Sequence, residues 1–286
     1  MSPCAWDRRI RRATELTSVY PFAAEGLRFY VRIAALQRNL YREFEQALAK
    51  SSPVLVPSLP RFLGTDVDIS VLVPRFSAFL KEVEPIAPMP IAQAAVTLAQ
   101  KSAAAWQRLI ADFCNNELRP ASAGVRARAE PDASEAMIAE QSLVWLFLQP
   151  YAEYLAARRG PVLIEGTPPN CPLCGAKPIV AVLRPEGDGA KKSLICMLCA
   201  HEWTFRRIYC PACGEEREPQ MAFYSAPEIP HVRVDVCETC HTYLKSVDLT
   251  KTGLAVPIID ELATLPLDLW ARENGYAKLQ INMLGI

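Results

Sequence analysis

The chain has 286 residues, of which 51% are hydrophobic and 22% are charged, and its 31 Lys and Arg side chains balance 31 Asp and Glu side chains. This length and composition suit a folded protein of one large or two modest domains. Because the formal net charge is zero, no overall field draws the chain to nucleic acid or to an anionic membrane. No run of eighteen apolar residues occurs, so we expect no stable membrane insertion.

The first part of the chain is predicted to be helical. Residues 1–20 contain four arginines but no apolar region followed by a small-residue cleavage site, so we expect no signal peptide there. Four further segments have apolar residues at helical intervals and are predicted as helices: residues 22–49, 71–83, 90–118 and about 132 to 158. Residues 90–118 form either one longer helix or a broken pair of helices.

Two connections interrupt these helices. A proline-containing connector is expected at residues 51–70 and a loop at residues 119–131, because proline blocks helix propagation. Pro150 interrupts the last helix and is expected to kink it. We therefore assign residues 1–165 to an all-α domain.

Eight of the ten cysteines then form four Cys-x-x-Cys pairs. This spacing lets a tight turn aim two thiolates at one cation while backbone N–H groups donate to the sulfurs. The first and third pairs read Cys-Pro-x-Cys-Gly, in which proline sets φ and glycine permits a left-handed residue. Each pair is thus half of a tetrahedral site. The pairs are Cys171 with Cys174, Cys196 with Cys199, Cys210 with Cys213, and Cys237 with Cys240.

The four pairs read as two copies of one unit, each a glycine-closed turn, a hairpin and a plainer turn. The gap between paired turns is 21 residues in the first copy and 23 in the second, which is typical of Cys4 sites. Serial pairing gives two rubredoxin-like or zinc-ribbon modules, at residues 166–208 and 209–256. A cross-brace, joining the first turn to the third and the second to the fourth, is left open.

Disulfides or a thioredoxin-type redox pair are less favoured, because four repeated turns exceed one redox motif and no βαβ context is present. An all-sulfur tetrahedral set suits zinc or a mononuclear rubredoxin-type iron, and ligand type alone does not separate them. His201 and His241 lie just after the second turn of each copy. We expect them to contact thiolate ligands rather than to bind metal, since each site already has four cysteines.

The remaining segments are predicted as follows. Residues 247–256 are expected to finish a strand, and residues 257–286 form a helical tail that packs on the body. His231 is expected at the surface or in a hairpin, and Cys114 in a helix core. The fold class is therefore α+β multidomain: an all-α N-terminal domain, two tandem Cys4 ribbons and a short helical tail.

The chain resembles the FdhE family of formate dehydrogenase accessory proteins. The resemblance rests on the four Cys-x-x-Cys pairs, His-Glu-Trp at 201–203, Cys-x-x-Cys-x-Thr-Tyr-Leu-Lys at 237–245 and Asp-Glu-Leu-Ala-Thr-Leu-Pro-Leu-Asp-Leu at 260–269. It is sharp over residues 171–276. Over residues 1–165 it is architectural only.

The resemblance implies a cytoplasmic maturation factor, not an enzyme, that binds the catalytic subunit of formate dehydrogenase before export. It also implies two rubredoxin-type iron ions per chain, with zinc as the alternative. No glycine-rich phosphate loop, HExxH or GxSxG motif is present, so no catalytic residue is expected.

Two other functions are weighed, and the oligomeric state is left open. One is a zinc-ribbon adaptor for nucleic acid or protein, and nucleic-acid binding is disfavoured because residues 171–250 carry nine basic and ten acidic side chains. The other is a rubredoxin-like electron carrier, which is disfavoured because a carrier would not need a helical region of about 165 residues. Homo-oligomers are compatible with the sequence.

Overall fold

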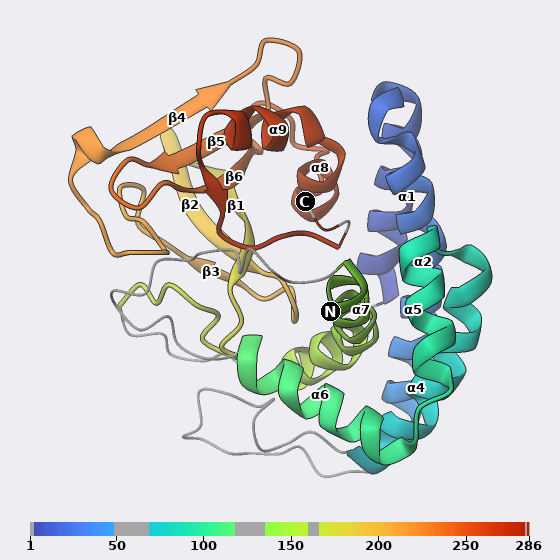
Figure 1. Ribbon diagram of the computed structural model, residues 1–286. Helices are drawn as coiled ribbons and strands as arrows, with labels where there is room; N and C mark the ends of the chain where they lie inside the picture. The colour runs from blue at the N-terminus through green and yellow to red at the C-terminus, as the bar shows by residue number, and fades with distance from the viewer. Residues whose placement is uncertain (1–2, 49–68, 118–134, 160–165, 284, 286) are drawn as a thin grey trace.

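The computed structural model describes residues 3–48, 69–117, 135–159, 166–283 and 285. A helical N-terminal region is followed by a sheet that carries two cysteine clusters and then by C-terminal helices (Figure 1). This is the predicted α+β class. The predicted loop at 119–131 and nearly all of the predicted connector at 51–70 lie outside the described residues.

The helices agree with the predicted segments where the two can be compared. The segment expected at 90–118 is a pair of helices separated by residues 100–102, and Ser102 Oγ accepts a bond from the N–H of Ala105 at 3.3 Å. The last helix continues through Pro150. The bounds are α1 (Pro3–Val19), α2 (Ala24–Leu48), α4 (Ile69–Val83), α5 (Met89–Ala99), α6 (Ala103–Glu117) and α7 (Glu135–Arg158), with short 3-10 turns η1 (Pro21–Ala23) and η2 (Glu84–Ile86).

Helix α1 has no counterpart in the sequence prediction. Its buried residues Trp6, Arg9, Ala13 and Leu16 follow helical spacing, but an arginine stands in the middle of the stripe. Arg9 Nη1 lies 2.7 Å from Glu153 Oε1 on α7 and is buried with it. An apolar-periodicity test fails here because a distant carboxylate makes the arginine a core residue.

One mixed sheet contains both ribbons. Its path is β3-β2-β1-β6-β5-β4, so each ribbon supplies three antiparallel strands and the two ribbons meet at β1 and β6. These two strands run parallel, with Ala181 opposite Ser246 and Leu183 opposite Asp248. The boundary expected between the two ribbons, at residues 208 and 209, therefore separates two halves of a continuous sheet. The strands are β1 (Pro178–Glu186), β2 (Gly189–Cys196), β3 (Glu202–Thr204), β4 (Met221–Ser225), β5 (Val232–Cys237) and β6 (Thr242–Asp248), with η3 (Glu218–Gln220) before β4.

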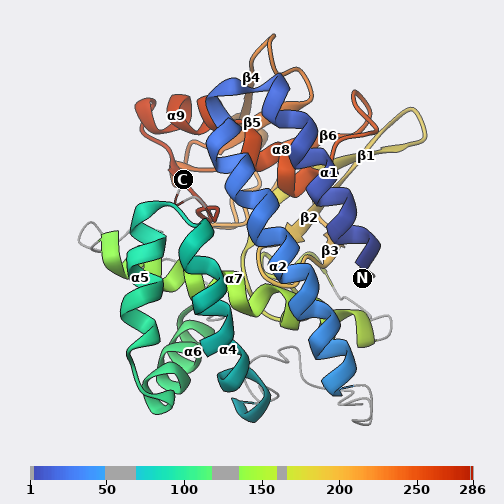
Figure 2. The same cartoon turned by 90° about the vertical axis from the view of Figure 1, so that its right-hand side faces the viewer.

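The two central strands are covered by the tail. Residues 179–183 are continuously apolar and buried, as expected of a strand covered on both faces. Helix α8 (Pro257–Ala263) packs on β1 and β6 and also touches α1, while α9 (Leu265–Glu273) packs on β5, as Figures 1 and 2 show. The strand expected to finish over 247–256 ends at Asp248, and a two-residue strand β7 (Ala277–Lys278) pairs with the start of β6.

Buried charges also join the tail to the sheet. Lys245 on β6 and Lys278 on β7 both contact Glu261 and Asp268, at 2.5 to 3.2 Å, and Tyr243 donates to Asp268 at 2.8 Å. All four charged side chains are at most 2% exposed. Two cations and two anions compensate one another, which is the condition for burying charge.

His231 corrects half of a prediction. We expected it at the surface or in a hairpin, and it does lie in the connection of the β4–β5 hairpin. It is not at the surface, because it is only 7% exposed and its Nε2 lies 2.9 Å from Asp260 Oδ1. The same carboxylate accepts two bonds from Arg12 of α1 and one from the N–H of Val256. Asp260 therefore connects the first helix, the second ribbon and the tail, and its position 29 residues after His231 hid the pair from sequence inspection.

The described helices were also compared with the length and hydropathy of a membrane span. Not one of them is both long and apolar enough to cross a bilayer.

Candidate metal centres

The first turn of each ribbon has the same backbone geometry. Gly175 donates its N–H to the carbonyl of Cys171 at 2.8 Å, and Gly214 donates to the carbonyl of Cys210 at 2.9 Å. The two glycines have φ of 84° and 78°, in the region where a Cβ is unfavourable. The predicted glycine role is therefore present in both copies.

The second turns close with non-glycine residues. Ala200 follows Cys199 with φ of 52°, and His241 follows Cys240 with φ of 54°. Ala200 and His241 are thus equivalent positions, whereas His201 lies one residue further along. The two histidines cannot play matching parts.

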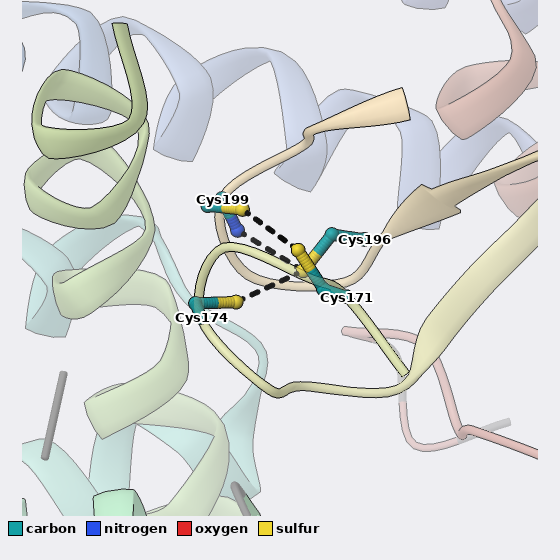
Figure 3. Close-up of side chains that lie close together, drawn as sticks. All are labelled: Cys171, Cys174, Cys196 and Cys199. Atoms are coloured by element: carbon teal, nitrogen blue, oxygen red, sulfur yellow. Dashed lines mark hydrogen bonds between the residues drawn. The ribbon is translucent and has the colours of Figure 1, made fainter. Parts of the chain in front are cut away.

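The turns meet in the serial order, not the cross-brace. Each tetrad has its four sulfurs within 4.8 Å of one another. Figure 3 shows the sulfurs of the first tetrad pointing toward a common centre from two facing turns. The tetrads are Cys171, Cys174, Cys196 and Cys199, hereafter site 1, and Cys210, Cys213, Cys237 and Cys240, hereafter site 2.

The sulfur geometry fits a tetrahedral metal. Sulfur pairs across facing turns are 3.3 and 3.6 Å apart in site 1 and 3.7 Å apart in site 2. A tetrahedron with metal–sulfur bonds of about 2.3 Å has edges of about 3.8 Å. A disulfide would need about 2.05 Å, and the described cysteines are free thiols. Zinc and rubredoxin-type iron both match this donor set.

Backbone N–H groups point at the sulfurs, as Cys-x-x-Cys turns require. Cys196 Sγ accepts from the N–H of Leu198 at 3.3 Å and of Cys199 at 3.4 Å (Figure 3 draws the second), and Cys210 Sγ accepts from Ala212 at 3.4 Å. Such bonds stabilise thiolate and orient it.

Electrostatics also favours a cation in each tetrad. Burial raises the pKa of Cys174 and of Cys199 well above the usual thiol value. In site 2, burial raises the pKa of Cys213 to about 11, whereas hydrogen bonding from Cys210 lowers the pKa of Cys240 to about 4. Four adjacent thiolates need a positive charge between them, and a metal cation at the centre of each tetrad would supply it.

The two sites differ in burial. All four cysteines of site 1 are at most 2% exposed, whereas Cys213 is exposed and Cys240 is half-buried. Helix α7 covers site 1: Trp145 Nε1 and Gln149 Nε2 both donate to the carbonyl of Met197, at 3.0 and 2.9 Å. Sequence reasoning did not find this contact, because Trp145 sits in a helix that is apolar all round and carries no sign of its neighbour.

Neither histidine shows a hydrogen bond to a sulfur. His201 stacks on Trp203 with ring centroids 6.4 Å apart, and its buried Nε2 has no hydrogen-bond partner in the part of the chain that the structure describes. His241 is exposed, with its ring 5.9 Å from Tyr276. Their expected contact with the thiolates stays a prediction.

A groove opens between the helical region and the second ribbon. Its volume is about 680 Å³, and most of its lining is apolar. Val19 and Phe22 come from the N-terminal helices, Tyr224 from β4 and Trp270 from α9. Phe22 is 54% exposed and Tyr224 is 41% exposed, so large apolar side chains reach solvent here.

Comparison with known proteins assigns the two ribbons. Residues 170–207 match the model of the FdhE central domain, and residues 208–284 match that of the FdhE C-terminal domain. A "Protein FdhE homolog" of Aquifex aeolicus is 36% identical over 117 residues, which are 40% of this chain and 41% of that protein. One of Haemophilus ducreyi is 30% identical over 141 residues, 49% of this chain and 46% of that protein. The chain thus matches less than half the length of these curated relatives.

The whole fold also has a solved counterpart. The structure matches the crystal structure of the FdhE protein from Pseudomonas aeruginosa with a TM-score of 0.67 and 23% sequence identity. The match covers 99% of this chain and 96% of that chain. This likeness extends the shared fold to the helical region.

Proposed function

The chain belongs to the FdhE family through its central and C-terminal domains, and from this premise we propose that it is a client-specific maturation factor for formate dehydrogenase. The observation that carries the proposal is that both Cys4 tetrads stand complete inside the two matched domains. In this function the protein is not an enzyme. It acts in the cytoplasm, where a reducing environment keeps the thiols available to metal.

The proposed cofactor is one metal ion in each tetrad, rubredoxin-type iron, with zinc as the alternative. The cysteines of sites 1 and 2 would hold it, and it would supply either one-electron chemistry as iron or structural cross-linking as zinc. Elemental analysis and a visible spectrum of protein purified without oxygen test this. Two coloured ferric tetrathiolates per chain are expected, and fewer than two metals would contradict the ligand assignment.

The proposed partner is the catalytic subunit of formate dehydrogenase, bound at the groove between helices and second ribbon. Concave apolar surface at a domain junction is where binding sites concentrate. Exposed aromatic side chains supply binding energy in such places. The balanced charge of the ribbons argues against a nucleic-acid partner.

Deletion and pull-down test the client assignment. A strain lacking this protein should make the client polypeptide but show little formate dehydrogenase activity, and the tagged protein should capture the subunit from cytoplasmic extract. Serine replacement of both cysteines of any one pair should lose that activity. Normal activity in the deletion strain, together with no captured subunit, would overturn the proposal and favour a zinc-ribbon adaptor.

A matched pair of variants tests the groove itself. Phe22→Asp places a charge among apolar groove residues and should weaken client capture at least tenfold. Leu254→Asp changes a residue that is 85% exposed and outside the groove, and capture should be unchanged. Equal capture by both variants would move the client to another surface.

A further inference from the structure

We propose that the two tetrads differ in ligand exchange: site 2 exchanges its metal with external thiolates or chelators, with Cys213 as the first sulfur to leave, while site 1 stays closed. The inference rests on the metal occupancy in the proposed function. It adds a division of labour between the sites, one that holds the fold and one whose metal is open to other ligands.

Site 1 is closed on each side by protein. The residues between its second pair of cysteines, Met197 and Leu198, are 2% and 0% exposed. Helix α7 donates two hydrogen bonds to the carbonyl of Met197. On the first turn, Leu173 is 4% exposed. An incoming ligand would have to displace α7 or open the hydrophobic core before reaching a sulfur.

The turns of site 2 are more exposed than those of site 1, although Tyr276 of the tail donates to Glu238 at 2.8 Å. The corresponding residues Ala212 and Glu238 are half-buried and Thr239 is exposed. Thr239 Oγ1 donates to Glu215 on the facing turn at 2.7 Å, and Thr239 is exposed although the Glu215 side chain is only 8% exposed. Cys213 is the exposed sulfur of this tetrad.

Exchange at site 2 needs no redox partner. A sulfur or nitrogen atom of the incoming ligand forms a bond to the metal as the bond from Cys213 Sγ breaks, and the released thiolate takes a proton from water. Cys240, which is half-buried, is the next sulfur accessible to the ligand. The oxidation state does not change, so zinc reports the same route as iron.

Chelator competition measures the difference on the full chain. Protein loaded with two zinc ions is mixed with 4-(2-pyridylazo)resorcinol, and release is followed by absorbance. We expect two phases, each of one zinc per chain, separated by at least tenfold in rate. Alkylation of the zinc-loaded protein with iodoacetamide and peptide mass mapping should find Cys213 modified first and the site 1 cysteines protected.

Three variants assign the phases. Cys213→Ser should remove the fast phase and leave the slow one, and Cys174→Ser, the same position in the first copy, is its matched control and should remove the slow one. Trp145→Ala removes one of the α7 bonds and should speed the slow phase several-fold without altering the fast phase.

Single-phase release, or alkylation at site 1 first, would overturn the inference. The alkylation map uses the unaltered protein, so misfolding of a variant does not remove this test. Because no client is present, failure here leaves the formate dehydrogenase assignment to be decided by the pull-down.

Discussion

Ala200 and His241 show how a single turn position differs between the copies. Both hold a left-handed backbone, which costs a residue with a Cβ about 1–2 kcal/mol. The first turns avoid this cost with glycine. The motif Cys-Pro-x-Cys-Gly therefore predicted the left-handed residue of the first turns. The second turns contain no glycine, so their left-handed residues could not be predicted from the sequence.

Replacing Ala200 by glycine should stabilise the metal-loaded protein. Relief of the left-handed strain outweighs the greater freedom of glycine in the unfolded chain, for a net gain of up to about 1 kcal/mol. Denaturant unfolding at fixed metal concentration measures it. Gly214→Ala is the control of opposite sign and should cost about 1 kcal/mol, since its φ is 78° and the new Cβ meets only Tyr209 at 3.4 Å. A loss of stability in Ala200→Gly would contradict the strain argument.

Asp260 should give a pH-dependent contribution to stability. Burial alone would raise its pKa, but hydrogen bonds from His231 and Arg12 outweigh burial and hold the pKa below the usual range. Its stabilising effect is therefore complete above the unfolded value of about 3.9 and is lost as pH falls through the lower folded value. Asp260→Asn should cost about 3 kcal/mol at neutral pH.

Measuring the unfolding of both proteins from neutral pH down to about pH 3, roughly one unit below the unfolded carboxyl pKa, tests the sign. The difference between wild type and Asp260→Asn should stay constant through the neutral range and shrink only at the acid end. Using the difference cancels the acid-induced metal loss that both proteins share. A difference that grows on acidification would mean the folded pKa is raised instead.

At the scale of elements, α1 shows what periodicity misses. Its buried face contains Arg9, whose charge is compensated by Glu153 on α7, 144 residues away. Burial raises the pKa of Glu153 and the nearby guanidinium opposes that rise. Sequence alone contains the helical spacing but not the partner, so a helix with a charged core position reads as solvent-exposed.

A double-mutant cycle tests this pair. Arg9→Leu leaves Glu153 buried without its cation and should cost about 3–5 kcal/mol. Adding Glu153→Leu should recover most of that loss, because two apolar side chains of fitting size replace a buried ion pair at little cost. Thermal or denaturant unfolding of the four proteins gives the coupling. Additive effects would show that α1 does not depend on this pair.

Across the whole molecule, the spacing of cysteines predicted both tetrads but not their surroundings. Helical periodicity placed α2, α4 and α7, because each has an apolar stripe or an apolar core of its own. The parallel pairing of β1 with β6 could not be read from sequence, since register between distant strands is set in three dimensions. The same holds for the cover of site 1 by α7.

This arrangement alters the expected consequence of metal loss. Ribbons this short bury little apolar surface of their own, and a structural metal supplies on the order of 10 kcal/mol of folding free energy. A self-contained first ribbon would unfold without the helices. In the structure, however, α7 bonds the site 1 turn and α8 packs on β1, so the helices and the first ribbon share one core.

Serine replacement of Cys171 and Cys174 should therefore reduce far-UV circular dichroism from the helices and lower the melting temperature in one transition. The matched change at Cys210 and Cys213 removes metal from the more exposed site and should leave most of the helical signal. Comparing the two double variants isolates coupling through α7 from the general cost of losing one metal. If the first variant keeps the full helical signal and loses only its ribbon, residues 1–165 are an independent domain and the contact at Met197 is energetically minor.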